Sequence, residues 1–411
     1  MDEIPRSVTA NPADDPTGGT HPGRPDFSLV LGGPTFQFAR RTHLSGNAGE
    51  GLRRRVLAIT LWVWLPLLVL SIIERYAIAG AIQIPFLHDI EVNVRFLIAL
   101  PILILAEVVV QERISPLVRR FEERRIVVAE DLPAFDAAIN SALRARDSVV
   151  LEAILVVLVY TLGLWIWRSQ VALENPTWYA LPEPEHLHLT WAGYWYVLVS
   201  LPVFQFVVLR WYMRLGIWFR LLWKISRLNL HLSAAHPDRA GGIGFLGKSS
   251  YAFSPILFAQ GTLMAGLIAS RIRYEGQTLL SFKMEAAGFV VFFVLVILGP
   301  LLMFTPILEG AQRRGAAEYG RLASRYVFAF EDKWIRSGEP ETPALADSED
   351  IQSLADLDNA YSNVRKMRIV PFGLDEMGRL AAATAAPLLP LLLTVFSLPE
   401  LLKVLVKIVF K

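Results

Sequence analysis

The sequence of 411 residues contains no cysteine. Disulfide bonds, thiol catalysis and thiolate metal sites are therefore excluded. Charged residues make up only 19% of the chain, against about 25% in a typical soluble domain. A Walker loop, kinase signatures and serine or metal-hydrolase motifs are also absent, so we expect no enzyme, catalytic residue, metal or cofactor. With a net charge of +2, we expect no nucleic-acid partner.

The sequence has long apolar runs instead, and hydrophobic residues make up 54% of it. Each run approaches the ~20 residues that a helix needs to cross a hydrocarbon core of ~30 Å. We therefore expect an all-α polytopic transmembrane bundle in a lipid bilayer, with six to seven spans. The expected spans are 56–73, 96–111, 148–167, 189–209, 249–270 and 286–308, and residues 380–399 form either a seventh span or a re-entrant hairpin.

Three further regions flank or follow this bundle of residues 53–309. Residues 1–52 are rich in proline, glycine and aspartate, which predicts a disordered tail. Residues 310–379 read as helices joined by an acidic linker. Residues 380–411 hold the seventh apolar run and end in an amphipathic helix, whose side of the membrane the sequence leaves open.

The distribution of lysine and arginine predicts the orientation. If the N-terminus is cytoplasmic, the segments between spans carry 31 basic residues on the cytoplasmic side and 6 on the other side. The positive-inside rule favours this arrangement. Residues 210–230 add a basic amphipathic pattern, which predicts either an interfacial helix on anionic lipid or an extension of the fourth span.

Two glutamates interrupt apolar runs and are the strongest candidates for function. Glu107 lies late in the second span and Glu152 early in the third, so both are expected near the same depth. Arg210 ends the fourth span at that depth. An ionisable group inside the hydrocarbon is costly and faces either protein or water. These three residues therefore form either an ion pathway or ion pairs that hold helices together.

A second candidate is the loop between the fourth and fifth spans. Its notable residues are His236, Asp238, Arg239, Gly241, Gly242 and Gly244. The glycines satisfy a dinucleotide-binding pattern in form, but the required strand before it and acid after it are missing. The loop is therefore either a ligand or gating loop or a purely structural turn that glycine permits.

Two sequence blocks resemble those of a family of bacterial multi-pass membrane proteins of unknown function. They are HPDRAGGIGFLG at 236–247 and DIQSLADLDNAYSNVRKMRIVPF at 350–372. The resemblance implies a bacterial inner-membrane location and carries no activity. Two functions remain open: a transporter or channel-like protein for a small ion or solute, and a sensor or scaffold that presents cytoplasmic loops to a protein partner. A homo-oligomer is also open.

Overall fold

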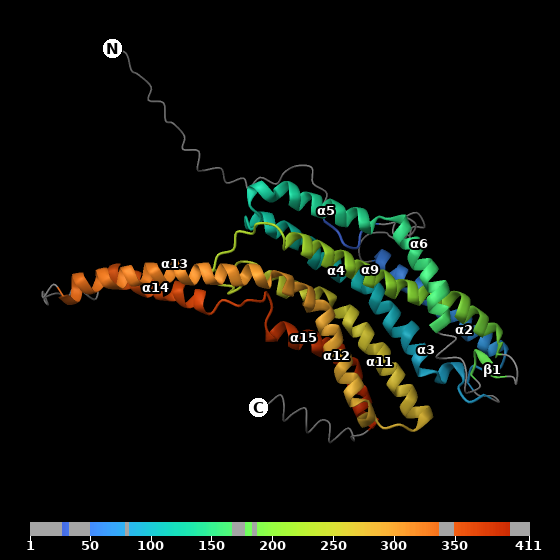
Figure 1. Cartoon of the computed structure of the whole chain (residues 1–411). Helices are drawn as coiled ribbons and strands as arrows, with labels where there is room; N and C mark the ends of the chain where they lie inside the picture. The colour runs from blue at the N-terminus through green and yellow to red at the C-terminus, as the bar shows by residue number, and fades with distance from the viewer. Residues whose placement is uncertain are drawn as a thin grey trace, which may run out of the picture.

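The computed structural model describes residues 27–32, 50–78, 82–166, 177–182, 187–336 and 349–394. Most of the predicted N-terminal tail, the acidic linker and the C-terminal amphipathic helix lie outside these ranges. The described chain is mainly helical (Figure 1). It also contains a short antiparallel hairpin of β1 (Ala180–Pro182) and β2 (Leu187–Leu189).

The described residues form a series of α-helices. They are α2 (Glu50–Ile73), α3 (Ile90–Val94), α4 (Leu100–Glu123), α5 (Leu132–Arg146), α6 (Val149–Leu158), α8 (Trp191–Trp195), α9 (Leu201–Ile225), α10 (Phe245–Ser249), α11 (Ser254–Glu275), α12 (Lys283–Leu298), α13 (Thr305–Glu331), α14 (Glu349–Arg365) and α15 (Leu374–Ala385). Single π-helical turns join α3 to α4 and α8 to α9, so each pair forms one long helix.

Seven helical segments are long and apolar enough to cross a membrane. They are Gly51–Ile73, Ile90–Glu123, Val149–Ile166, Trp191–Ile225, Phe245–Glu275, Leu279–Arg336 and Leu374–Thr394. On α2, the side chains of Leu57, Leu61 and Leu65 point outward and are about half exposed. An apolar outer surface of this kind matches hydrocarbon rather than water. The protein is an integral membrane protein, and the predicted all-α transmembrane bundle is confirmed.

Of the two alternatives predicted for residues 210–230, an interfacial helix or an extension of the fourth span, the structure shows the extension. Residues Trp191–Ile225 form one continuous helical segment, so the basic stretch extends the span. Its apolar side chains Trp211, Leu215 and Trp218 are buried inside the protein, and so is Arg214. The reason is that this arginine finds a carboxylate partner within the bundle, which removes the need for its charge to face water.

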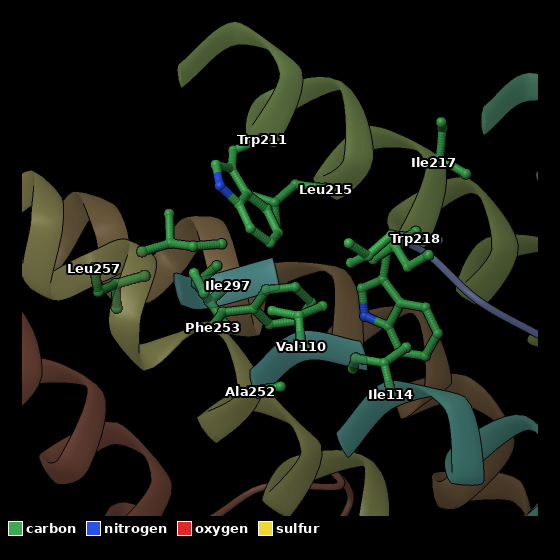
Figure 2. Close-up of a cluster of buried hydrophobic side chains, with 14 of the residues drawn as sticks. Val110, Ile114, Trp211, Leu215, Ile217, Trp218, Ala252, Phe253, Leu257 and Ile297 are labelled. Carbon is green, nitrogen blue, oxygen red and sulfur yellow. The ribbon is translucent and has the colours of Figure 1, made fainter. Parts of the chain in front are cut away.

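The core lies where α4, α9, α11 and α12 meet. Figure 2 shows Val110 and Ile114 of α4 beside Trp211 and Trp218 of α9, with Phe253 close to them. Trp211 is 1% exposed, and its indole N–H donates to the backbone oxygen of Leu103 at 2.9 Å. This large buried side chain thus has a partner for its polar atom, as burial requires.

The sixth span continues into a long helical hairpin. After α12, a 3-10 turn at Gly299–Phe304 leads into α13, which extends away from the bundle with α14 alongside it (Figure 1). Tyr326 donates its hydroxyl to the backbone oxygen of Asp350 at 3.1 Å, and Trp334 donates to the carboxylate of Asp350 at 3.0 Å. We call α13, the π-helical turn Asp332–Arg336 that continues it, and α14 together the α13–α14 hairpin.

Candidate functional site

Glu107 lies at the centre of a buried charge cluster that joins three helices. It is 8% exposed on α4. Arg214 of α9 donates to its Oε1 at 2.8 Å, and Arg55 of α2 forms an ion pair with its Oε2. Arg210 of α9 lies 3.7 Å from Oε1. The structure therefore brings three arginines to one carboxylate.

Arg210 also connects Glu107 to the second predicted glutamate. Its Nε lies 3.7 Å from Oε1 of Glu152, which is in the first turn of α6 and 8% exposed. The structure thus brings the three predicted residues Glu107, Glu152 and Arg210 together. We call Arg55, Glu107, Glu152, Arg210 and Arg214 the charge cluster.

Two members of the charge cluster were missed by sequence reasoning. Arg214 follows Arg210 by four residues, so both side chains lie on the same helix face. Arg55 is the last residue of an arginine triplet that precedes the first apolar run. Both signals are present in the sequence, but the triplet also fits the positive-inside pattern and Arg214 also fits a basic surface helix.

The charge cluster contains three arginines and two glutamates. Ion pairs at this burial are sensitive to the loss of one partner, because the remaining charge is left without compensation. A small hollow between α5 and α9 measures about 10 Å³. That is room for about one water molecule, and neither glutamate lines it. Three arginines lie within ion-pair distance of Glu107, and this geometry fits ion pairs that tie helices together.

The loop between α9 and α10 is organised around the side chain of Asp238. Its carboxylate accepts hydrogen bonds from the backbone N–H groups of Ala240 at 2.8 Å, Gly242 at 3.1 Å and Gly244 at 2.9 Å. Burial opposes ionisation of this carboxyl, but the three N–H donors outweigh it and lower the pKa of Asp238. Nδ1 of His236 lies 2.8 Å from the same carboxylate.

The backbone of this loop adopts left-handed conformations at three residues, two of which are glycines. Gly241 and Gly242 adopt φ values of +67° and +98°, and Arg239 adopts +53°. The carbonyl of Arg239 accepts from the backbone N–H of Arg368 at 2.7 Å. The guanidinium of Arg368 reaches the carbonyl of Asp238 at 3.3 Å. All six predicted loop residues therefore lie in one ordered loop, bonded to the segment that follows α14.

Neither metal-ligand groups nor comparisons with known proteins assign a function to these two sites. No group of three or more histidine, aspartate or glutamate side chains among the described residues could hold a metal ion. Comparison with protein-family models, with curated proteins and with solved structures gives no match.

Proposed function

We propose that this protein is a bacterial inner-membrane scaffold or sensor that presents the α13–α14 hairpin to a cytoplasmic protein partner. The observation that carries the proposal is an uncovered apolar face outside the bundle. Phe328 and Ile335 are 61% and 69% exposed. They lie seven residues apart, Phe328 on α13 and Ile335 on the π-helical turn Asp332–Arg336 that continues it. Large apolar side chains gathered on a non-membrane surface mark an interaction site.

The charge around this face indicates the chemistry of the partner. Arg321 and Arg325 are exposed and precede Phe328 by two turns and one turn. Helices bind partners through apolar anchors at such intervals, and complementary charges at the rim fix register and orientation. The expected partner is therefore a protein with an apolar groove bordered by aspartate and glutamate.

The location and orientation rest on sequence. The ratio of 31 to 6 basic residues supports a cytoplasmic N-terminus, which places the hairpin on the cytoplasmic side. The two blocks at 236–247 and 350–372 support a bacterial inner membrane through their family resemblance. Exposed Arg220 and Arg227 at the end of α9 support contact with anionic lipid at the inner leaflet.

Site-specific photocrosslinking in cells tests the scaffold proposal. A photoreactive residue at 328 or 335 should capture the same protein, and Arg321→Glu with Arg325→Glu should abolish both adducts. A photoreactive residue at Gln352, which is exposed on α14, is the matched control and should not capture it. Adducts only with lipid would contradict the proposal, and adducts only with a second copy of the chain would favour a homo-oligomer instead.

An ion pathway through the membrane is the second candidate. The observation that favours it is the position of Arg210, 3.7 Å from each of the two glutamates, because neighbouring ionisable groups of this kind line ion and proton routes. A transporter or channel would conduct when purified and placed in liposomes. Glu107→Gln and Glu152→Gln should then each reduce the flux without unfolding the protein.

A further inference from the structure

The short N-terminal segment Phe27–Val30 is buried although it belongs to no helix. Its four residues are 4%, 6%, 1% and 2% exposed. The next residue, Leu31, is 48% exposed. The segment is drawn in blue beside α5 in Figure 1. An isolated stretch with this degree of burial occupies a groove between other elements.

Side chains from three helices bind this segment. The hydroxyl of Ser28 donates to Gln111 of α4 at 2.5 Å. Arg146 of α5 donates to the carbonyl of Ser28 at 2.6 Å, and Arg214 of α9 donates to the carbonyl of Val30 at 3.4 Å. The ring of Phe27 lies 6.4 Å from that of Trp218 on α9. The groove is thus formed by α4, α5 and α9, and it recognises peptide carbonyls and apolar side chains.

The groove adjoins the charge cluster. Gln111 follows Glu107 by four residues, so the two side chains lie one turn apart on the same face of α4. Arg214 donates with one nitrogen to Glu107 at 2.8 Å and with another to Val30 at 3.4 Å. Arg214 therefore lies between Phe27–Val30 and Glu107, and the segment covers the charge cluster at this arginine.

The two arginines that bind the segment have other partners. Arg146 makes two hydrogen bonds to the carboxylate of Asp147, at 2.8 and 2.6 Å, and Arg214 keeps its bond to Glu107. Departure of the segment would therefore leave neither guanidinium as an unpaired charge. Loss of binding then exposes only a few apolar side chains, which makes opening far cheaper than unfolding of the bundle.

We propose that Phe27–Val30 is a detachable plug in a peptide-binding groove between α4, α5 and α9, and that its departure uncovers Arg214 beside Glu107. The docked state is the dominant one because it buries Phe27, Leu29 and Val30. The groove in its open state is a site for an extended apolar peptide of the same kind. This inference is independent of the partner proposed for the α13–α14 hairpin.

Because the natural chain has no cysteine, single cysteines report on the plug directly. Ser28→Cys places a thiol in the plug, and Leu31→Cys places one at the exposed residue just beyond it. Ser226→Cys, at a site that is 7% exposed at the end of α9, reports unfolding of the bundle. Each full-length variant is purified in detergent and its rate of reaction with a water-soluble maleimide is measured.

The proposal predicts how the maleimide reaction rates of the cysteine variants differ. Ser28→Cys should react at least tenfold more slowly than Leu31→Cys, yet to completion while Ser226→Cys is still unmodified. A synthetic peptide of residues 25–33 should accelerate the Ser28→Cys reaction at least threefold, because it occupies the vacated groove. Adding Phe27→Asp should raise the Ser28→Cys rate to that of Leu31→Cys while the Ser226→Cys rate stays unchanged.

Two results would overturn the proposal. Equal rates for Ser28→Cys and Leu31→Cys would mean that the segment is not seated. Reaction of Ser28→Cys only together with Ser226→Cys would mean that the segment is a permanent part of the fold. Neither conclusion depends on the Phe27→Asp variant, which could fail to fold.

Discussion

Arg214 of α9 donates to Glu107 of α4 at 2.8 Å, and this arginine is only 3% exposed. The pair joins two membrane-spanning segments at their most buried charges. Arg55 adds a third helix to the same carboxylate, and Arg210 connects it to Glu152 of a fourth. A single glutamate thus holds α2, α4 and α9 together, with α6 linked through Arg210.

Replacement of this glutamate should destabilise the protein. Glu107→Gln leaves Arg214 and Arg55 without their carboxylate, which should lower the free energy of unfolding by ~3–5 kcal/mol where the pairs are dry. Thermal unfolding of the detergent-solubilised protein measures the loss. Adding Arg214→Gln should recover part of it, because one uncompensated charge is then removed.

The control for this variant is Glu309→Gln. Glu309 pairs with Arg313 one turn away on α13, but its side chain is 44% exposed. Its loss should change the free energy of unfolding by no more than about 0.5 kcal/mol. If Glu107→Gln proves as stable as Glu309→Gln, the charge cluster does not tie the helices together.

The loop around Asp238 should make stability depend on pH. Its three backbone donors lower the pKa of this carboxyl in the folded protein, below the ordinary value of about 3.9 that the unfolded chain has. The stabilisation is therefore complete above the unfolded-state value and is lost as the pH falls through the folded-state pKa. Asp238→Asn should reduce stability at pH 7 and flatten the decline that the natural protein shows as the pH falls below about 4.

Unfolding midpoints across this pH range measure the effect. Asp356→Asn, at an exposed position on α14, should follow the natural protein at every pH. An Asp238→Asn protein with an unaltered pH profile would show that the carboxylate is not what organises the loop.

The packing of α15 on α11 should tolerate no side chain at Gly261. A Cβ at this residue would lie 2.0 Å from the backbone oxygen of Thr384. Gly261→Ala should therefore destabilise the protein by about 1–3 kcal/mol and increase hydrogen exchange in residues 374–385. Gly288→Ala on α12 is the matched control, since nothing lies within 4 Å of its Cβ position. Equal behaviour of the two variants would contradict the close packing.

Reporter fusions test the orientation. Fusions after Arg120 and Arg227 should read as cytoplasmic, and a fusion after Gly276 should read as external, because the basic residues concentrate on the first side. A cytoplasmic signal after Gly276 would reverse the orientation and remove the hairpin from the cytoplasm.

Much of the fold could be predicted because each span is one continuous apolar run. Glu107, Glu152 and Arg210 could also be placed together, since each occurs at the predicted cytoplasmic end of its run. The sequence left two alternatives open for the end of α9, because hydropathy alone treats Arg214 as a surface residue. Only the packing of α4 on α9 brings its charge to Glu107.

Contacts between residues far apart in the sequence were harder to predict. The docking of Phe27–Val30 depends on side chains from three helices, 83 or more residues away. The order of the loop at 236–244 was closer to prediction, because an aspartate before glycines readily accepts nearby backbone N–H groups. Its attachment to Arg368 depends on a contact 130 residues apart, which no local pattern indicates.

Ion flux through the purified protein in liposomes tests most directly whether the charge cluster holds helices rather than conducts ions. The natural protein, Glu107→Gln and Arg210→Gln are compared with protein-free liposomes for protons, sodium and potassium. We predict flux at the level of protein-free liposomes in all three, with the effect of Glu107→Gln confined to stability. Flux in the natural protein that falls in both variants, while both remain folded, would contradict the scaffold proposal and establish the ion pathway.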